Sequence, residues 1–184
     1  ARFFLFGARD IWFVVGLPLF LVSELSWSHT KVGFYMAFWV IGYGFIQTIA
    51  PNLTKGNKQS ASNWLLALIL LTLLISIALY FEVHPSFSVL LGLALFGFIF
   101  AINSSVHSFL ILAYSENDKV LLNVGFYYMA NAGGRLVGTL ISGLAFHFGG
   151  LILCLFASIL FLIICFLITS VLPSLAKNGQ RKIH

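Results

Sequence analysis

The stretch that decides the fold class is NVGFYYMANAGGRLVGTLISG, residues 123–143. It is apolar enough to lie in a bilayer, yet polar side chains recur in it at every fourth position: Asn123, Tyr127, Asn131 and Arg135. A step of four turns a helical side chain by only about 40°, so these residues share one face of a helix. A second face carries three small residues at the same spacing: Gly134, Gly138 and Ser142. Such spacing lets two membrane helices pack closely, so the stretch predicts a membrane helix with a polar stripe and a packing stripe.

The arginine in this helix needs an explanation, because a charged side chain inside a membrane span costs roughly 3 kcal/mol or more. The rest of the chain is equally apolar: 60% of its 184 residues are hydrophobic, 8% are charged, and the mean hydropathy is +1.03. A soluble domain carries about 25% charged residues. The composition therefore predicts an all-α integral membrane protein. The net charge of +5 does not indicate nucleic-acid binding, since the basic residues are sorted by loop.

Six apolar segments of about the length that spans a bilayer follow one another. We expect them at residues 3–22, 31–50, 62–81, 86–108, 120–146 and 151–172. Polar residues occur within the first, second, fourth and fifth segments, whereas the third and sixth are almost purely apolar. The order polar, polar, plain is thus repeated. We predict a single six-helix transmembrane domain built as a 3+3 repeat, with the third and sixth helices facing lipid.

The basic residues outside the segments predict the orientation. Seven of them lie on the side of the N-terminus: Arg2, Lys55, Lys58, Lys119, Lys177, Arg181 and Lys182. Only Lys31 lies on the other side. Cytoplasmic loops carry an excess of lysine and arginine. We therefore expect a multi-pass protein of the inner (plasma) membrane, with both ends of this segment in the cytoplasm.

Two arginines and one aspartate lie inside the predicted spans. At 1.5 Å per residue, Arg9 lies about 10 Å and Arg135 about 20 Å from the cytoplasmic surface, and Asp10 follows Arg9. Five uncharged polar residues lie near these depths on the fourth and fifth segments: Asn103, His107, Asn123, Tyr127 and Asn131. Two positive charges against one negative charge leave a positive cavity. We predict that these side chains bind an anionic substrate.

Each charged residue also has a plainer interpretation. Arg9 could extend its side chain to the cytoplasmic interface, because arginine carries its charge on a long apolar stem. Arg135 could form a purely structural ion pair with Asp10. Asp10 could instead carry a coupling proton, and His107 could be a hydrogen-bonded packing residue.

The sequence lacks the motifs of catalysis and metal binding. It contains no His-Glu-x-x-His, no cysteine–histidine cluster and no Gly-Lys-Ser/Thr loop, so we expect no metal and no cofactor. An intramembrane serine protease would need a glycine two residues before its serine, but Leu140 stands there before Ser142. We therefore expect a protein that is not an enzyme.

Four runs of sequence are more specific than general hydrophobicity: FFLFGARDIWFVVGLPLFL (3–21), FWVIGYGFIQTIAP (38–51), FAINSSVHSFLI (100–111) and VGFYYMANAGGRLVGTLISG (124–143). They resemble the C-terminal half of ArsJ-type permeases, which are organoarsenical efflux transporters of the major facilitator superfamily. The resemblance implies that the six helices are the seventh to twelfth of a twelve-helix transporter, with the first six as their partner. It also implies export of 1-arseno-3-phosphoglycerate and a role in arsenic resistance, and it assigns no site residue.

Three hypotheses follow from the residues and the resemblance. In the first, the chain is half of an exporter of a phosphorylated or arsenylated organic anion, bound by the two arginines. In the second, it belongs to a proton-coupled exporter of drugs or other small solutes, with Asp10 as the proton carrier. In the third, the helices form a membrane scaffold and the arginines pair only with Asp10 or with lipid headgroups.

Overall fold

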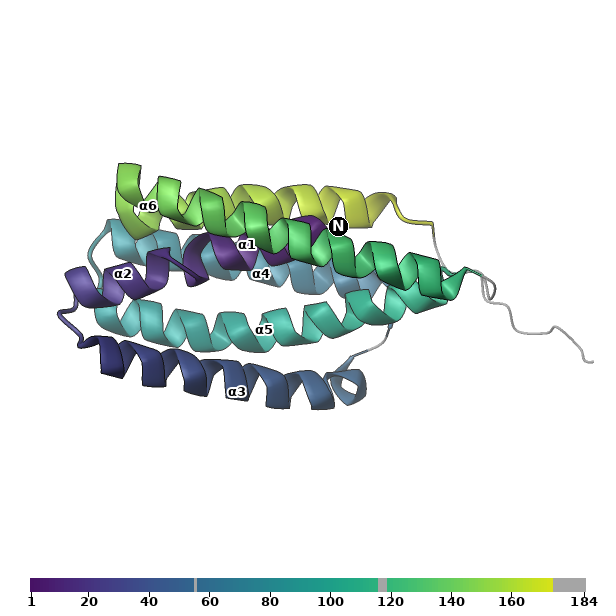
Figure 1. Ribbon diagram of the computed structural model, residues 1–184, viewed down its shortest axis with the longest axis horizontal. Helices are drawn as coiled ribbons and strands as arrows, with labels where there is room; N and C mark the ends of the chain where they lie inside the picture. The colour runs from purple at the N-terminus through teal and green to yellow at the C-terminus, as the bar shows by residue number, and fades with distance from the viewer. Residues whose placement is uncertain (55, 116–118, 174–184) are drawn as a thin grey trace, which may run out of the picture.

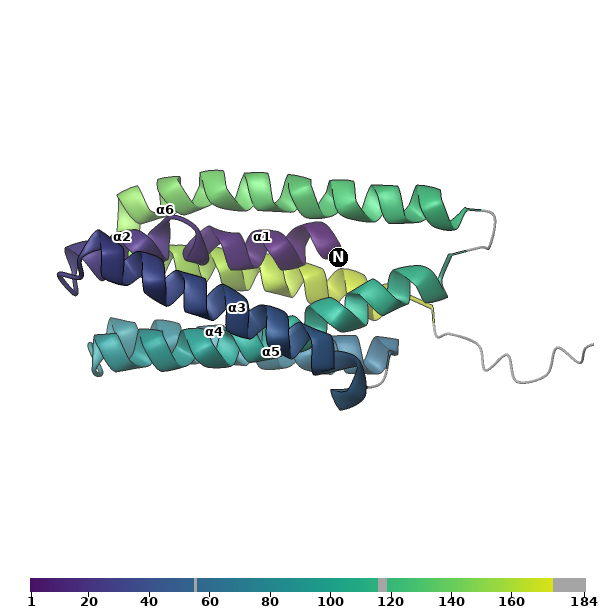
Figure 2. The same cartoon turned by 60° about the horizontal axis from the view of Figure 1, so that its bottom comes forward.

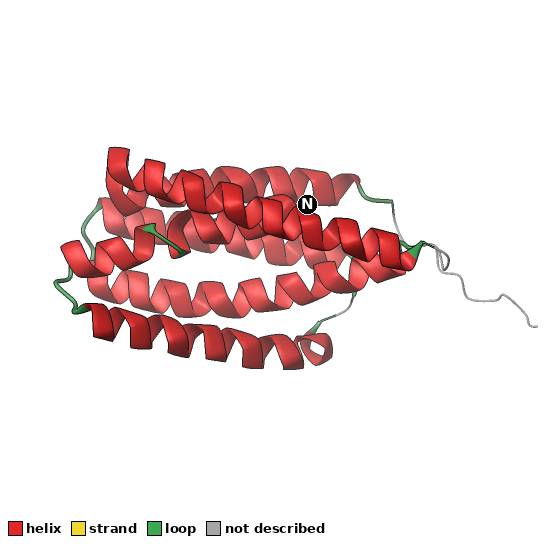
Figure 3. Cartoon of the chain, viewed as in Figure 1, coloured by secondary structure: helices red, strands yellow, loops and turns green. Residues whose placement is uncertain are grey.

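The computed structural model describes residues 1–54, 56–115 and 119–173, and every regular element in these ranges is a helix (Figures 1 and 3). The six helices are α1 (Arg2–Phe13), α2 (Gly16–Ser23), α3 (His29–Leu53), α4 (Lys58–Tyr80), α5 (Pro85–Ala113) and α6 (Val120–Val171). Lys55, Lys177, Arg181 and Lys182, on which part of the orientation argument rests, lie outside the described residues. The prediction of an all-helical bundle is confirmed.

Among the described residues, five stretches are long and apolar enough to cross a membrane, and the last of them, α6, is 52 residues long. This helix folds back at Gly149 and Gly150, where the backbone leaves the helical conformation and Gly150 takes a φ of 61°. A left-handed φ is accessible to glycine without steric cost. The reversal at these two glycines divides α6 into a first arm (120–148) and a second arm (151–171). The two arms correspond to the fifth and sixth predicted segments. Figure 2 shows α1 between the two arms.

The first predicted span is divided as well, into α1 and α2, with Val14 and Val15 between them. Pro18 has no N–H group, so the carbonyl of Val14 cannot receive the helical hydrogen bond from that position. The N–H of Gly16 leaves the helical ladder and donates to Ser142 Oγ of the first arm, 3.0 Å away. The span expected at 3–22 is thus present as Arg2–Ser23, but it consists of two helices rather than one.

Helix α3 is the least covered of the long helices. Ser28 caps its N-terminus by accepting from the N–H of Lys31 at 3.3 Å. Three side chains attach it to α5: Tyr35 Oη donates to the Leu90 carbonyl at 3.3 Å, Trp39 Nε1 to the Leu93 carbonyl at 2.9 Å, and Gln47 Nε2 to Ser104 Oγ at 3.4 Å. Its other face is apolar and exposed, and carries Phe34, Phe38, Val40, Ile41 and Phe45.

Glycines of the first arm allow α1 to approach closely. A Cβ atom at Gly134 would lie 2.1 Å from the Phe3 carbonyl oxygen, and one at Gly138 would lie 2.6 Å from the Gly7 carbonyl oxygen. Both distances are far below van der Waals contact, so no side chain fits at these positions while the helices keep their separation. Gly134, Gly138 and Ser142 are all buried, and the packing stripe faces α1 and the start of α2.

Gly134→Ala should destabilise the bundle by about 1–3 kcal/mol, the usual cost of overpacking, because the new methyl group collides with backbone rather than with a mobile side chain. Gly133→Ala is the matched control, since its nearest heavy atom would be Phe3 Cε2 at 3.5 Å, an ordinary contact. The thermal midpoint of the full-length protein in detergent should fall for the first variant only. Equal midpoints for the two variants would contradict the packing argument.

The described lysines used to predict the orientation lie at the two ends of the bundle. Lys58 starts α4 and Lys119 precedes α6, at the end where α3 and α5 also terminate (Figure 1). Lys31 lies at the opposite end, in the first turn of α3. Arg2 differs from the sequence expectation: its guanidinium lies inside the bundle, against Ser104 of α5 and Tyr127 of α6.

Candidate functional site

Asp10 is the centre of an ion-pair cluster on α1. Its side chain is 1% exposed, in a segment where a lone carboxylate would be costly. Arg9 Nε donates to Asp10 Oδ1 at 2.6 Å, and Arg9 Nη2 forms an ion pair with the same oxygen, also at 2.6 Å. Arg135, from the first arm of α6, donates from Nε to Asp10 Oδ2 at 3.1 Å. One carboxylate thus joins two guanidinium groups from two helices.

The two arginines differ in how much of each guanidinium remains available. The Arg9 side chain is 11% exposed and directs two nitrogens at Asp10, so it serves mainly as the counter-ion of that carboxylate. The Arg135 side chain is 56% exposed and bonds to Asp10 through Nε alone. Its two terminal nitrogens have no hydrogen-bond partner in the described part of the chain and are therefore available to another acceptor. In this cluster the surplus positive charge belongs to Arg135.

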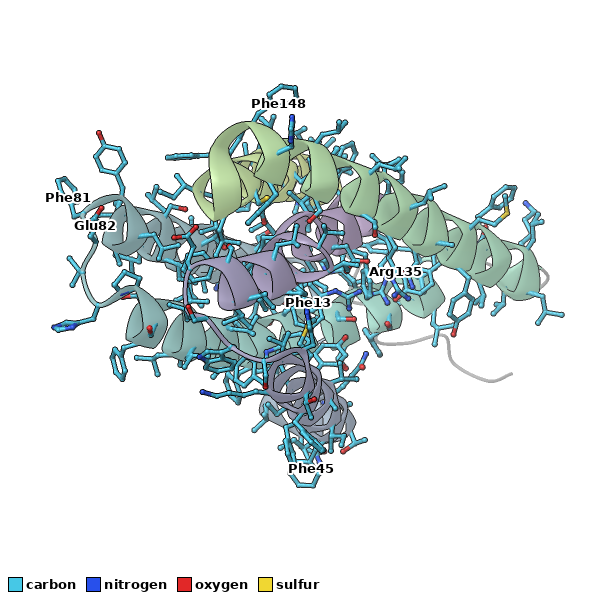
Figure 4. The ribbon with its side chains drawn as sticks, turned by 60° about the vertical axis from the view of Figure 1, so that its left-hand side comes forward. Phe13, Phe45, Phe81, Glu82, Arg135 and Phe148 are labelled. Carbon is cyan, nitrogen blue, oxygen red and sulfur yellow. The ribbon has the colours of Figure 1, made fainter. Side chains whose placement is uncertain are left out.

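Arg135 faces a hollow of about 330 Å³. The residues around it come from α1 and the first arm of α6: Asp10, Val14, Ala132, Arg135, Leu136 and Thr139. Figure 4 shows Arg135 pointing from α6 toward the middle of the molecule, whereas Phe45 of α3 and Phe148 of α6 point outward. The interruption between α1 and α2 lies at the same hollow, because Val14 lines it.

Arg2 is a third guanidinium that the sequence argument missed. Its Nη1 donates to both the carbonyl and the Oγ of Ser104, each at 3.1 Å. The group lies over two aromatic rings, with Cζ 3.9 Å from the centroid of Phe6 and 4.3 Å from that of Tyr127. The signal was present in the sequence, since Arg2, Phe6 and Arg9 are spaced to share one helical face.

The positive charges lie close enough to repel one another. The Cζ of Arg9 is 5.0 Å from the Phe6 centroid and that of Arg2 is 3.9 Å from it, so the two carbons are at most 8.9 Å apart. Two unit charges about 9 Å apart repel by about 2 kcal/mol at an effective dielectric constant of 20. Three guanidinium groups and one carboxylate give the cluster a net charge of +2.

The uncharged residues predicted for the site do not all join this cluster. His107 is buried and points at the second arm of α6, with Nε2 3.4 Å from Thr169 Oγ1 and Nδ1 3.0 Å from the Asn103 carbonyl. The Asn103 side chain is fully buried, and neither atom of its amide has a partner within the described ranges. These contacts fit the plainer interpretation of His107 as a packing residue.

The polar stripe of the first arm of α6 consists of Asn123, Tyr127, Asn131 and Arg135. Asn123 Nδ2 donates to Ser115 Oγ at 3.0 Å, and the hydroxyls of Tyr127 and Ser108 are 2.5 Å apart. Asn131 Oδ1 is buried and has no partner among the described residues. Asn123 and Tyr127 line a second hollow of about 390 Å³, together with Arg2 and His107. The stripe is therefore divided between two hollows, with Arg135 at one and Tyr127 at the other.

The residues that the structure describes contain no group of three or more His, Cys, Asp or Glu side chains that could hold a metal ion. The two cysteines, Cys154 and Cys165, are buried and unpaired with each other. Through its described residues the site can offer guanidinium groups, amides and hydroxyls. These groups bind anions by charge-assisted hydrogen bonds.

The comparisons with known proteins agree with this architecture at the level of the family. No curated protein matches this sequence closely enough to lend it a function. The model of the Major Facilitator Superfamily matches residues 1–183, which is nearly the whole chain. Helices long enough to cross a membrane and polar side chains inside the bundle are both typical of secondary transporters. The chain therefore belongs to the Major Facilitator Superfamily, a family of multi-pass membrane transporters.

Proposed function

We propose that this chain is the C-terminal bundle of an exporter for an organic anion that carries a phosphoryl or arsenyl group, as in ArsJ-type permeases. In this proposal the protein lies in the inner membrane, and the end of the bundle with Lys58 and Lys119 faces the cytoplasm. The cargo is 1-arseno-3-phosphoglycerate or an anion of similar charge.

The geometry of Arg135 is the observation that carries the proposal. Its side chain is half exposed beside a hollow, and only its Nε bonds to Asp10. A guanidinium fork that presents two terminal nitrogens is matched to a carboxylate, phosphate or arsenate group. Arg9 has a supporting role in this scheme: it neutralises Asp10, so that Asp10 does not cancel the charge of Arg135.

The same contacts weigh against Asp10 as a proton carrier. Three arginine nitrogens already bond to its two oxygens. Protonation would place a hydrogen on an oxygen that faces a donor. We therefore assign Asp10 the role of a counter-ion that orients Arg135.

The exposed faces support a second bundle as the partner. On α3 only Val32 and Ala50 are buried, and its outer face is a row of large apolar side chains. The first arm of α6 is exposed along much of its length, with apolar side chains that include Leu121, Met129 and Leu136. In the proposal the N-terminal six helices of the same transporter lie against α3 and the first arm, and the substrate passes between the two bundles.

Transport by the full-length protein in inverted membrane vesicles tests the proposal. Uptake of radiolabelled 3-phosphoglycerate, as an available phosphorylated anion, should exceed that of control vesicles, and excess unlabelled arsenylated or phosphorylated anions should reduce it at least about tenfold. A cationic drug such as tetraphenylphosphonium should not compete. Competition by the drug alone would favour the drug exporter, and no uptake of any probe would favour the scaffold.

A further inference from the structure

Arg2 is a cation that pairs with no carboxylate among the residues that the structure describes. Within the described residues the ion pairs of this region are those of Arg9 and Arg135 with Asp10, and neither involves Arg2. Its Nε is buried and makes no hydrogen bond there, and its other contacts are Ser104 and two aromatic rings. Rings and hydroxyls lower the cost of burying a guanidinium, but they do not neutralise its charge. A charge kept in this state inside a membrane bundle points to an anionic ligand.

Arg2 and Arg135 are two separate cationic centres. Arg135 is joined to Asp10, and Asp10 is eight positions beyond Arg2 on α1, a rise of about 12 Å along the helix. The ring of Phe6 and the neutral pair of Arg9 with Asp10 lie between them. The positive charge that Asp10 does not neutralise therefore lies at two separate centres, Arg2 on α1 and Arg135 on α6.

We propose that Arg2 is a second substrate-binding residue, and that the transported anion carries two separate negatively charged groups, one bound by Arg135 and the other by Arg2. This inference rests on the proposed function, because it takes Arg135 as the first anion contact. The net charge of +2 in the cluster matches two anionic groups of one ligand better than a single monoanion.

The surroundings of Arg2 connect three helices at this second centre. Ser104 Oγ of α5 accepts from Arg2 Nη1 at 3.1 Å and from Gln47 Nε2 of α3 at 3.4 Å. Tyr127 of α6 covers the guanidinium and bonds to Ser108. An anionic group bound at Arg2 would therefore have amide and hydroxyl groups within reach from α3, α5 and α6, which supply orientation as well as charge.

Two probes that differ by one carboxylate test the inference. 3-Phosphoglycerate carries a phosphate and a carboxylate at opposite ends, whereas glycerol 3-phosphate carries the phosphate only. We expect calorimetric titration of the purified full-length transporter to show at least about tenfold tighter binding of 3-phosphoglycerate, the effect of one charge-assisted contact. Arg2→Gln should remove this preference and weaken 3-phosphoglycerate about tenfold, while Arg2→Lys should retain part of it.

A stability measurement separates a binding role from a structural one. Arg2→Gln removes an unneutralised cation, so its thermal midpoint without ligand should equal or exceed that of the wild type. A lower midpoint together with equal weakening of both probes would assign Arg2 to the structure and overturn the inference.

The two proposals fail in different ways. If Arg135→Gln weakens both probes but Arg2→Gln leaves their ratio unchanged, the second centre is wrong and the proposed function stands. If Arg135→Gln changes neither affinity, or if the wild type binds neither probe, the proposed function fails and the second centre with it.

Discussion

Arg135→Gln in the full-length transporter should abolish uptake of phosphorylated organic anions into inverted vesicles. The substitution removes the guanidinium of a residue that lines the hollow beside α1, and with it two terminal nitrogens. Each hydrogen bond to a charged group contributes about 1.5–3 kcal/mol, so losing two of them lowers the rate at least about 100-fold. Folding should survive, because Arg9 still pairs with Asp10 at 2.6 Å.

Lys31→Gln is the matched control for that experiment. It also removes one positive charge, but at the opposite end of the bundle, where Lys31 lies 3.9 Å from the ring centroid of Trp27. Membrane insertion should be equal for the two variants by protease protection and blotting. Wild-type uptake by the Arg135 variant would remove that residue from the substrate site, and equal losses in both variants would indicate a general effect of charge.

Asp10→Asn should destabilise the protein strongly rather than alter coupling alone. The amide keeps the size of the carboxylate but leaves two guanidinium groups without a counter-ion, and its NH₂ group points a donor at a donor. Removing one partner of a buried ion pair costs about 3–5 kcal/mol. Arg135 can turn toward water, but Arg9, only 11% exposed, cannot, so most of the cost arises at Arg9. The thermal midpoint in detergent should fall by several degrees.

The double variant Asp10→Asn with Arg9→Gln separates this explanation from proton coupling. It removes the guanidinium of Arg9 together with the carboxylate of Asp10, so Arg9 no longer leaves a buried charge without a partner. The thermal midpoint should therefore recover toward that of the wild type. A proton carrier would behave differently: Asp10→Asn alone would then fold normally and lose only proton-driven transport. A normal midpoint for the single variant would therefore contradict the counter-ion role.

The polar and packing stripes of residues 123–143 allowed much of this arrangement to be predicted. Four-residue spacing is a local property of a helix, so it is visible without a structure. It indicated that Gly134 and Gly138 share a face, and the structure shows which helix they contact. The pairing of Arg135 with Asp10 was one of the two interpretations left open, and the structure shows that contact.

The features that the sequence did not predict depend on which helices pack against each other in the folded protein. Arg2 was predicted to lie outside the spans because it precedes the first apolar run, but neighbouring helices extend past it and surround it with Ser104 and Tyr127. His107 lines the hollow beside Arg2, and its Nε2 lies 3.4 Å from Thr169 Oγ1, a contact that the sequence does not reveal. Depth follows from counting residues, whereas the direction of a side chain depends on packing between helices. The break after α1 was missed for a similar reason, since it depends on an acceptor 126 residues away in the chain.

The hydrogen bond that Ser142 Oγ accepts from Gly16 limits which residues can replace serine at position 142. Ser142 is fully buried, and its Oγ receives the N–H of Gly16 where the first span changes direction. Alanine or glycine would fit the space but leave an amide hydrogen without an acceptor at membrane depth, and leucine or phenylalanine would have no room. Size and hydrogen bonding thus impose separate conditions on a single site, and a small hydroxylated residue meets both.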